Sequence, residues 1–346
     1  MNKFQIIMTM LTGVLVTACP GPDPESGDKT WSVEVDNLAP ALLAVAPLDS
    51  AAQDLIAVGG PLRGDDAPSI LRRNATSAWG TVDAPANFKG AMWWAWASSP
   101  DNVWIVGEDL QVAHGGIDSL ELVDVPEVES STKATLYGVW GSGPNDVWMV
   151  GGSPLYADGP EGVIFHYDGT KVSKIELTGT ASIAATETFF KVWGTSANDV
   201  MIVGTKGTAL HYDGTTWTLT ETGTKNRLLT VHGRSPSEMF AVGGSFSGSV
   251  LQYDGIRWRE IGDETMPFIN GVYAAADGTV WVCGPTGYVA QWDGQTWTQY
   301  DVGVVGRDFH GILATDDGVY TAGGLLAIQP GPRLGIVARY GSSPTE

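Results

Sequence analysis

One stretch of this sequence, Val139-Trp140-Gly141-Ser142-Gly143-Pro144-Asn145-Asp146-Val147-Trp148-Met149-Val150-Gly151, is repeated along the chain. Near copies are Val192-Trp193-Gly194-Thr195-Ser196-Ala197-Asn198-Asp199-Val200-Met201-Ile202-Val203-Gly204 and Ala95-Trp96-Ala97-Ser98-Ser99-Pro100-Asp101-Asn102-Val103-Trp104-Ile105-Val106-Gly107. Weaker copies fill most of the remaining chain. When the closing glycine is the anchor, seven copies end at Gly59, Gly107, Gly151, Gly204, Gly243, Gly284 and Gly323, which are 39 to 53 residues apart.

Each repeat divides into four short strands. A first strand ends at a Ser-x-Pro-Asn-Asp turn, whose proline and Asn/Asp residues favour a tight reversal. The Val-Trp-x-Val-Gly segment after it is apolar at successive positions, so we expect a second strand that is buried on both faces. A third strand ends at Asp-Gly, a strong hairpin signal, and the fourth carries an outer tryptophan. The Asp-Gly units are Tyr167-Asp168-Gly169, Tyr212-Asp213-Gly214, Tyr253-Asp254-Gly255 and Trp292-Asp293-Gly294.

Four antiparallel strands in every 44 residues or so are typical of a β-propeller blade. The sequence therefore predicts an all-β, seven-bladed β-propeller over residues 30–343. The last repeat stops at Arg339-Tyr340-Gly341 and lacks its outer tryptophan strand. The segment Thr30-Trp31-Ser32-Val33-Glu34-Val35 has the pattern of that missing strand. We expect it to complete the seventh blade and to close the ring.

These W-G-x-x-x-x-D-V-W-x-V-G and Y-D-G-x-x-W units resemble those of bacterial β-propellers that are often carried on predicted lipoproteins. At the level of the repeat they are similar to Kelch proteins, to BNR/Asp-box propellers and to the photosystem II assembly-factor family. The resemblance covers residues 30–343 and implies the fold. It implies little about function, because the shared residues belong to the scaffold.

The N-terminus has the pattern of a lipoprotein signal peptide over residues 1–18. Lys3 is followed by a mostly apolar stretch of about 13 residues, shorter than the roughly 20 that a membrane-spanning helix needs. Val16-Thr17-Ala18-Cys19 resembles a lipobox, which implies cleavage before Cys19 and acylation of its thiol; an ordinary cleavage site with an incidental cysteine is the alternative. Residues 19–29 are rich in proline and acidic residues and predict a tether. We therefore expect an exported protein, lipid-anchored to a membrane of the cell envelope.

Composition excludes some functions. The 346 residues include 45 glycines and 14 tryptophans, and the 43% of hydrophobic residues provide for a large core. The net charge of −20 argues against a nucleic-acid-binding groove, which needs a basic surface. The tryptophans fall mainly at repeat positions, so their number gives no evidence of a sugar-stacking site. Cys283 lies in an apolar strand and is expected to be a small core residue.

No catalytic constellation emerges from the motifs. The sequence has no metal-ligand spacing and no nucleophile elbow, and we expect no cofactor. The acid-rich loops at residues 64–66 and 158–162 are candidates for Ca²⁺ but lack EF-hand spacing. His166, His211 and His232 occupy repeat positions and are expected to be structural, whereas His114 has no clear role. Asn270 and His310 align at the start of innermost strands, where either could face the central channel.

One face of the ring is expected to carry the binding site. In four-stranded blades, the turns after the first and third strands share one face, and the loops after the second and fourth share the other. Every long insertion falls on the second face, at residues 59–69, 151–162, 323–335, 125–135 and 177–188. Variable loops on a rigid scaffold commonly carry binding. The candidate ligand-binding residues there are Arg63, Asp65, Asp66, Glu127, Glu129, Tyr156, Asp158, Glu161 and Arg333.

The sequence is compatible with three functions. The first is a non-enzymatic, membrane-tethered monomer that binds a protein or a glycan through the loop-rich face. The second is a glycan hydrolase or lyase with its site at the channel mouth, which requires acidic groups beside His310 and Asn270. The third is an assembly factor for a membrane complex.

Overall fold

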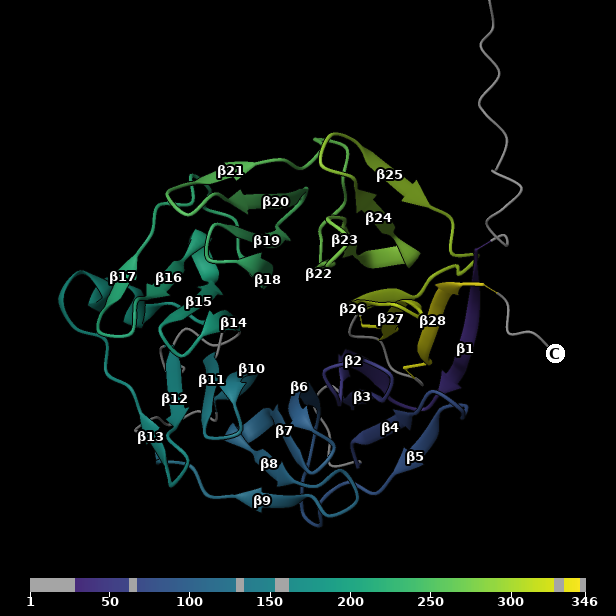
Figure 1. Cartoon of the computed structure of the whole chain (residues 1–346), viewed down its shortest axis with the longest axis horizontal. Helices are drawn as coiled ribbons and strands as arrows, with labels where there is room; N and C mark the ends of the chain where they lie inside the picture. The colour runs from purple at the N-terminus through teal and green to yellow at the C-terminus, as the bar shows by residue number, and fades with distance from the viewer. Residues whose placement is uncertain (1–28, 62–66, 129–133, 153–161, 327–332, 343–346) are drawn as a thin grey trace, which may run out of the picture.

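The computed structural model describes residues 29–61, 67–128, 134–152, 162–326 and 333–342, and these residues form a ring of seven four-stranded antiparallel sheets around a central channel (Figure 1). The predicted seven-bladed β-propeller is confirmed. From the channel outward the strands are, in blade 1, β2 (Ala41–Pro47), β3 (Leu55–Gly60), β4 (Ser69–Arg73) and β5 (Gly80–Val82); in blade 2, β6 (Met92–Ser99), β7 (Asn102–Gly107), β8 (Val112–Gly115) and β9 (Glu121–Val123); in blade 3, β10 (Thr135–Gly143), β11 (Asp146–Gly152), β12 (Val163–Tyr167) and β13 (Val172–Lys174); in blade 4, β14 (Phe189–Ser196), β15 (Asp199–Gly204), β16 (Ala209–Tyr212) and β17 (Trp217–Leu219); in blade 5, β18 (Leu228–Ser235), β19 (Glu238–Gly244), β20 (Gly248–Tyr253) and β21 (Trp258–Glu260); in blade 6, β22 (Gly271–Ala274), β23 (Val280–Cys283), β24 (Val289–Trp292) and β25 (Trp297–Tyr300); and in blade 7, β26 (Asp308–Thr315), β27 (Gly318–Gly324), β28 (Gly335–Gly341) and β1 (Thr30–Leu38).

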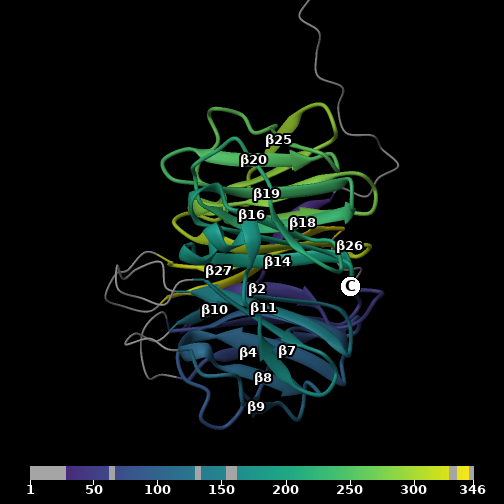
Figure 2. The ribbon, with the colours of Figure 1, turned by 90° about the vertical axis from the view of Figure 1, so that its left-hand side faces the viewer.

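The strands run between the two faces of the ring, as the side view in Figure 2 shows. We call the face with the connections from first to second and from third to fourth strands the turn face. The opposite face, with the connections from second to third strands and the linkers between blades, is the loop face. Four 3₁₀ helices lie on loop-face connections: η1 (Glu108–Leu110), η2 (Gly179–Thr186), η3 (Thr205–Gly207) and η4 (Pro285–Gly287). Among the described residues, no helix has the length and apolar character needed to cross a bilayer.

The second strands form the buried layer that the repeat predicted. In β7, β11 and β15 every residue from the second position onward is buried, so each strand packs against a neighbouring blade on both faces. Cys283 in β23 is fully buried, as expected of a core residue, and burial raises the pKa of its thiol.

The Trp-Gly pair of the repeat is a contact between neighbouring blades. A Cβ atom added to Gly141 would lie 2.7 Å from the Trp96 ring of the preceding blade, and one added to Gly194 would lie 2.7 Å from the Trp140 ring. Gly233 has the same relation to Trp193, at 2.8 Å. The same Cβ atoms would also lie 2.4–2.7 Å from a backbone carbonyl oxygen of their own blade, so the tryptophan of the preceding blade and the paired second strand together require glycine at this position.

The Asp-Gly hairpins are tied to the Asn-Asp turns of the same blade. Asp213 Oδ1 accepts the backbone N–H groups of Thr215 and Thr216, and Gly214 follows with φ +90°. A Cβ atom on Gly214 would collide with the side chain of Asn198, so the two turns fit together only with glycine there. The hydroxyl of Thr170, with the backbone N–H groups of Lys171 and Thr170, lowers the pKa of Asp168 to about 2, and backbone N–H groups lower the pKa of Asp254 to about 2, which supports the structural role expected of these aspartates.

The N-terminal strand closes the ring as predicted. β1 pairs antiparallel with β28, and Trp31 lies opposite Tyr340, just as Trp217 lies opposite Tyr212 in blade 4. The Trp31 and Tyr340 rings are 5.4 Å apart. Glu34 of β1 accepts a hydrogen bond of 2.8 Å from the Trp79 indole of blade 1, so the same strand also holds blades 7 and 1 together.

We predict that deletion of residues 30–36 lowers the Tm by many degrees. β28 would become an open sheet edge, and the contact of Glu34 with Trp79, which joins blades 7 and 1, would be lost. The Trp31→Ala variant should show a smaller decrease in the same direction. Thermal unfolding monitored by tryptophan fluorescence measures both. An unchanged Tm after the deletion would disprove the closure.

We predict that Gly194→Ala lowers the free energy of unfolding by about 1–3 kcal/mol, the usual cost of overpacking. The matched control is Gly143→Ala, because nothing lies within 4 Å of a Cβ atom at Gly143. Urea denaturation should show a lower midpoint for Gly194→Ala and a midpoint near wild type for Gly143→Ala. Equal midpoints would show that neither the Trp140 ring nor the Asp199 carbonyl, which lies 2.4 Å from the added Cβ atom, constrains this position.

Candidate functional site

A β-bulge in the innermost strand directs one residue of each blade into the channel. The pairing of first and second strands skips one residue in six blades; in β14, for example, Phe189 and Lys191 are paired and Phe190 is not. In blade 6 Asn270 occupies the same place, immediately before β22. Such bulges re-aim side chains. The seven residues so placed are Leu43, Trp93, Tyr137, Phe190, Leu229, Asn270 and His310.

These bulge residues fill the channel near the loop face. The rings of Trp93 and Tyr137 lie 4.9 Å apart, and Tyr137 contacts Phe190 at 5.5 Å. Trp93 of blade 2 also contacts His310 of blade 7 at 5.8 Å, although blade 1 lies between them in the ring. The channel is therefore constricted by aromatic side chains at this level.

The two polar residues expected at the channel mouth are both bonded to the backbone. His310 Nδ1 lies 2.6 Å from the carbonyl oxygen of Leu43, and the Asn270 amide donates to the carbonyl of Phe309 at 2.8 Å. Each bond joins one blade to the next. Burial, assisted by the charge of Lys191, lowers the pKa of His310 to about 4, so the ring is neutral at pH 7. The ionisable group that acts on His310 is thus the amine of Lys191, whereas the hydrolase hypothesis required acidic groups.

Lys191 is a buried amine that sequence reasoning missed. Only 3% of it is exposed, and its Nζ donates to the carbonyl of Tyr137 at 3.0 Å. The same Nζ lies 3.3 Å from the centre of the Trp94 ring, a cation–π contact that spans blade 3. Desolvation lowers its pKa well below the ordinary value for lysine. The sequence signal was present, because Lys191 is the one charged residue at this repeat position in the described blades, where the others carry alanine, glycine, threonine or, in blade 2, Trp94.

His232 occupies the aromatic repeat position, as expected. Its ring stacks on Tyr273 at 4.1 Å and contacts Trp193 at 5.2 Å. Its Nδ1 accepts the backbone N–H of Ala274 at 3.1 Å, so this nitrogen carries no proton. Burial and the positive charge of Arg234 lower the His232 pKa to about 3.

Three of the histidines form the same kind of side-chain hydrogen bond between two strands of their blades. His166 Nε2 bonds Asp146 at 2.6 Å and His211 Nε2 bonds Asp199 at 2.6 Å, each linking the third strand to the second. His114, which had no role in the sequence analysis, makes the same link to Asn102 at 2.7 Å. The hydroxyl of Ser142 donates to Asp146 rather than to a histidine. This trio therefore lacks the nucleophile–base contact of a catalytic triad.

The loop-face candidates are only partly described. Arg63, Asp65, Asp66, Glu129, Tyr156, Asp158 and Glu161 lie outside the described residues. The backbone of Arg333 bonds Ala39 and Leu325, and its guanidinium bonds the Leu325 carbonyl at 3.4 Å. Among the described residues, no cluster of three or more His, Cys, Asp or Glu side chains could hold a metal ion.

Exposed apolar side chains mark the loop face, a feature that the sequence analysis did not single out. Phe246, between β19 and β20, is fully exposed, and Val305, on the linker from blade 6 to blade 7, is 91% exposed. Ile183 in η2 is 69% exposed. Of the six large apolar side chains that are exposed among the described residues, these three lie on loop-face connections, whereas Ile256 lies on a turn-face hairpin.

Comparisons with known proteins support the fold. No family model and no curated protein matches the sequence. Among solved structures, "YCF48 bound to D1 peptide" is similar with a TM-score of 0.66 at 16% identity, covering 94% of this chain and all of that one. YCF48 from Cyanidioschyzon merolae gives 0.65 at 14% identity, covering 91% of this chain and all of that one. The WD40 repeats of RRP9 give 0.65 at 9% identity over 90% of this chain and 97% of that one.

We predict that acid destabilises the ring through His232. Its neutral form is held in the fold, whereas the unfolded chain protonates near pH 6.5, so stability falls as the pH drops from 6.5 toward 3. The His232→Phe variant loses the bond from Ala274 and should be less stable at pH 7.5 by about 1–3 kcal/mol. Its disadvantage should shrink as the pH falls to 4.5.

Urea denaturation at several pH values measures both free energies. If the free energies of unfolding of wild type and His232→Phe differ by the same amount at every pH between 7.5 and 4.5, protonation of His232 does not contribute to the loss of stability in acid.

Proposed function

We propose that this chain is an exported, lipid-anchored propeller that binds a protein partner through its loop face and catalyses no reaction. The observation that carries the proposal is the set of protruding apolar side chains on that face, Ile183, Phe246 and Val305. Their exposure costs free energy in water, and covering them by a partner recovers it.

The position of the chain ends supports the same orientation. Thr30 pairs with Gly341, and both lie at the turn face because β1 runs from there toward the loop face. A tether that precedes Lys29 and ends at an acylated Cys19 leaves the ring from the turn face. The loop face then points away from the membrane, toward partners.

The channel favours a binding protein over an enzyme. The polar atoms of His310 and Asn270 bond the backbone of neighbouring blades, and the Trp93 ring packs against the ring of His310. The similar solved structures include one propeller described with a bound peptide and others described as WD40 propellers. A role in assembling a membrane complex is the second candidate, and the YCF48 likeness favours it over a glycan-active enzyme.

The proposal is tested with a photo-crosslinking amino acid placed singly at Phe246 and at Val305 in intact cells. The matched control is Ile256, which is 88% exposed but lies on a turn-face hairpin. We expect both loop-face positions to crosslink one and the same protein and Ile256 to crosslink none. Crosslinks from Ile256 alone, or from all three positions alike, would refute the loop face as the binding surface.

The anchor is tested in the same cells. The Cys19→Ser variant should move from the membrane fraction to the soluble fraction and should fail to incorporate labelled palmitate. Retention in the membrane would refute the lipid anchor without bearing on the loop face.

A further inference from the structure

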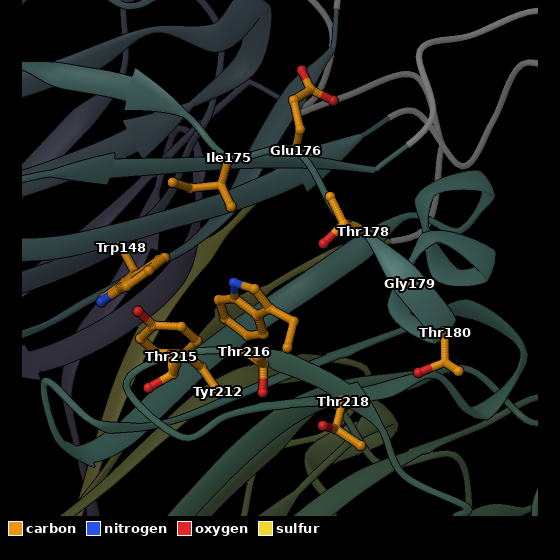
Figure 3. A pocket seen from close by; sticks show the side chains of 11 residues that line it. Trp148, Ile175, Glu176, Thr178, Gly179, Thr180, Tyr212, Thr215, Thr216 and Thr218 are labelled. Carbon is orange, nitrogen blue, oxygen red and sulfur yellow. The ribbon is translucent and has the colours of Figure 1, made fainter.

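A groove of about 490 Å³ lies on the rim of the ring between blades 3 and 4 (Figure 3). One wall is the linker that follows β13, including Ile175, Glu176 and Thr178, and the other is the hairpin from Tyr212 to Thr218. Trp148 lies at one end. The groove is lined by Trp148, Ile175, Glu176, Thr178, Gly179, Thr180, Tyr212, Thr215, Thr216, Trp217 and Thr218.

In blades 5 and 6 the outer tryptophan closes the equivalent interface with a hydrogen bond, whereas the buried indole N–H of Trp31 in blade 7 has no partner among the described residues. The Trp258 indole donates to Thr220 of the preceding blade at 3.2 Å, and the Trp297 indole donates to the Ile261 carbonyl at 2.8 Å. Trp217 has the same position in blade 4. Within the described part of the chain its indole N–H makes no hydrogen bond, and it borders the groove instead.

The linker between blades 3 and 4 explains the opening. Ile175 makes the same backbone bond, to Ile164, that Ile261 makes to Val250, so the two blades match up to this point. The chain then turns at Gly179, with φ +62°, into η2, which packs against β17.

The lining combines aromatic rings with unpaired hydrogen-bonding groups. The Trp217 ring lies 5.0 Å from Tyr212 and 5.4 Å from Trp148, and the indole N–H of Trp148 is buried without a hydrogen-bond partner. Exposed threonines surround these rings, and in the described residues the hydroxyls of four of them make no hydrogen bond within the protein. These four are Thr178, Thr180, Thr215 and Thr218.

We propose that this rim groove binds a neutral oligosaccharide. The negative face of an aromatic ring attracts the polarised C–H groups on the apolar face of a sugar ring. Threonine hydroxyls both donate and accept hydrogen bonds, as sugar hydroxyls do, and the indole N–H of Trp217 is available to donate to them. The groove follows the rim from the turn-face hairpin of blade 4 to the first residues of η2, and none of Ile183, Phe246 and Val305 lines it, so it goes beyond the proposed function and is tested separately.

The charges exclude other ligands of similar shape. No lysine or arginine lines the described groove, and Glu176, which pairs with Lys174 at 2.7 Å, would repel an anionic glycan. A proline-rich peptide also fits between aromatic rings, but its backbone offers mainly carbonyl acceptors. A carboxylate such as Glu176 accepts only, which matches sugar hydroxyls and not such a peptide.

The proposal is tested on an array of neutral and anionic glycans, followed by titration calorimetry with the best neutral oligosaccharide and with decaproline. We expect Trp217→Phe to weaken saccharide binding about fivefold, because the ring is kept and one donor is lost. We expect Trp217→Phe to leave the Tm unchanged, whereas Trp297→Phe, which breaks the bond to Ile261, lowers the Tm and leaves binding intact.

A second pair of variants avoids the tryptophan. Thr218→Ala should weaken binding, and Thr298→Ala, the same position beside the closed interface of blade 6, should not. The proposal is overturned if no neutral glycan binds on the array, if decaproline binds more tightly than the saccharide, or if Thr218→Ala and Trp217→Phe bind as wild type does.

Discussion

The pairing of β1 with β28 is the contact on which the ring depends. It joins residues more than 300 positions apart in the sequence, as the bond between Ser32 and Arg339 shows. Without it, blade 7 would have three strands and an open edge, and blade 1 would lose the Glu34 contact to Trp79. The same pairing fixes Thr30 and Gly341 side by side at the turn face.

Inside this closed ring, neighbouring blades are joined by two kinds of contact. Tryptophans pack onto glycines of the next blade, as Trp140 does onto Gly194. Around the channel, side chains reach across to backbone carbonyls: Asn270 to Phe309, Thr230 to Asn270, and Lys191 to Tyr137. The side chains around the channel therefore help to hold the blades together. The side chains that remain available to a ligand lie on the loops and on the rim.

Features that repeat were predictable from the sequence, and features that break the repeat were not. Repetition predicted the seven blades, the closing strand with Trp31 opposite Tyr340, and the packing role of His232. The link from His114 to Asn102 was missed because asparagine replaces the aspartate of the other blades. The rim groove depends on the path of a linker beyond Ile175 and on a bond that Trp217 does not make, and no local pattern encodes either. The bulges depend on register between strands, which is a property of the paired sheet.

The closing strand also constrains how the chain reaches its fold. Contacts between the two ends of a chain have the highest contact order, and they form late because a long loop must be closed first. β1 therefore has no strand to pair with until β28 has been synthesised. Ser32, Glu34 and Asp36 alternate with apolar residues along β1. Polar and charged side chains of this kind discourage an unpaired strand from joining the wrong sheet. The residues that later complete the ring thus also protect the unfinished chain from aggregation.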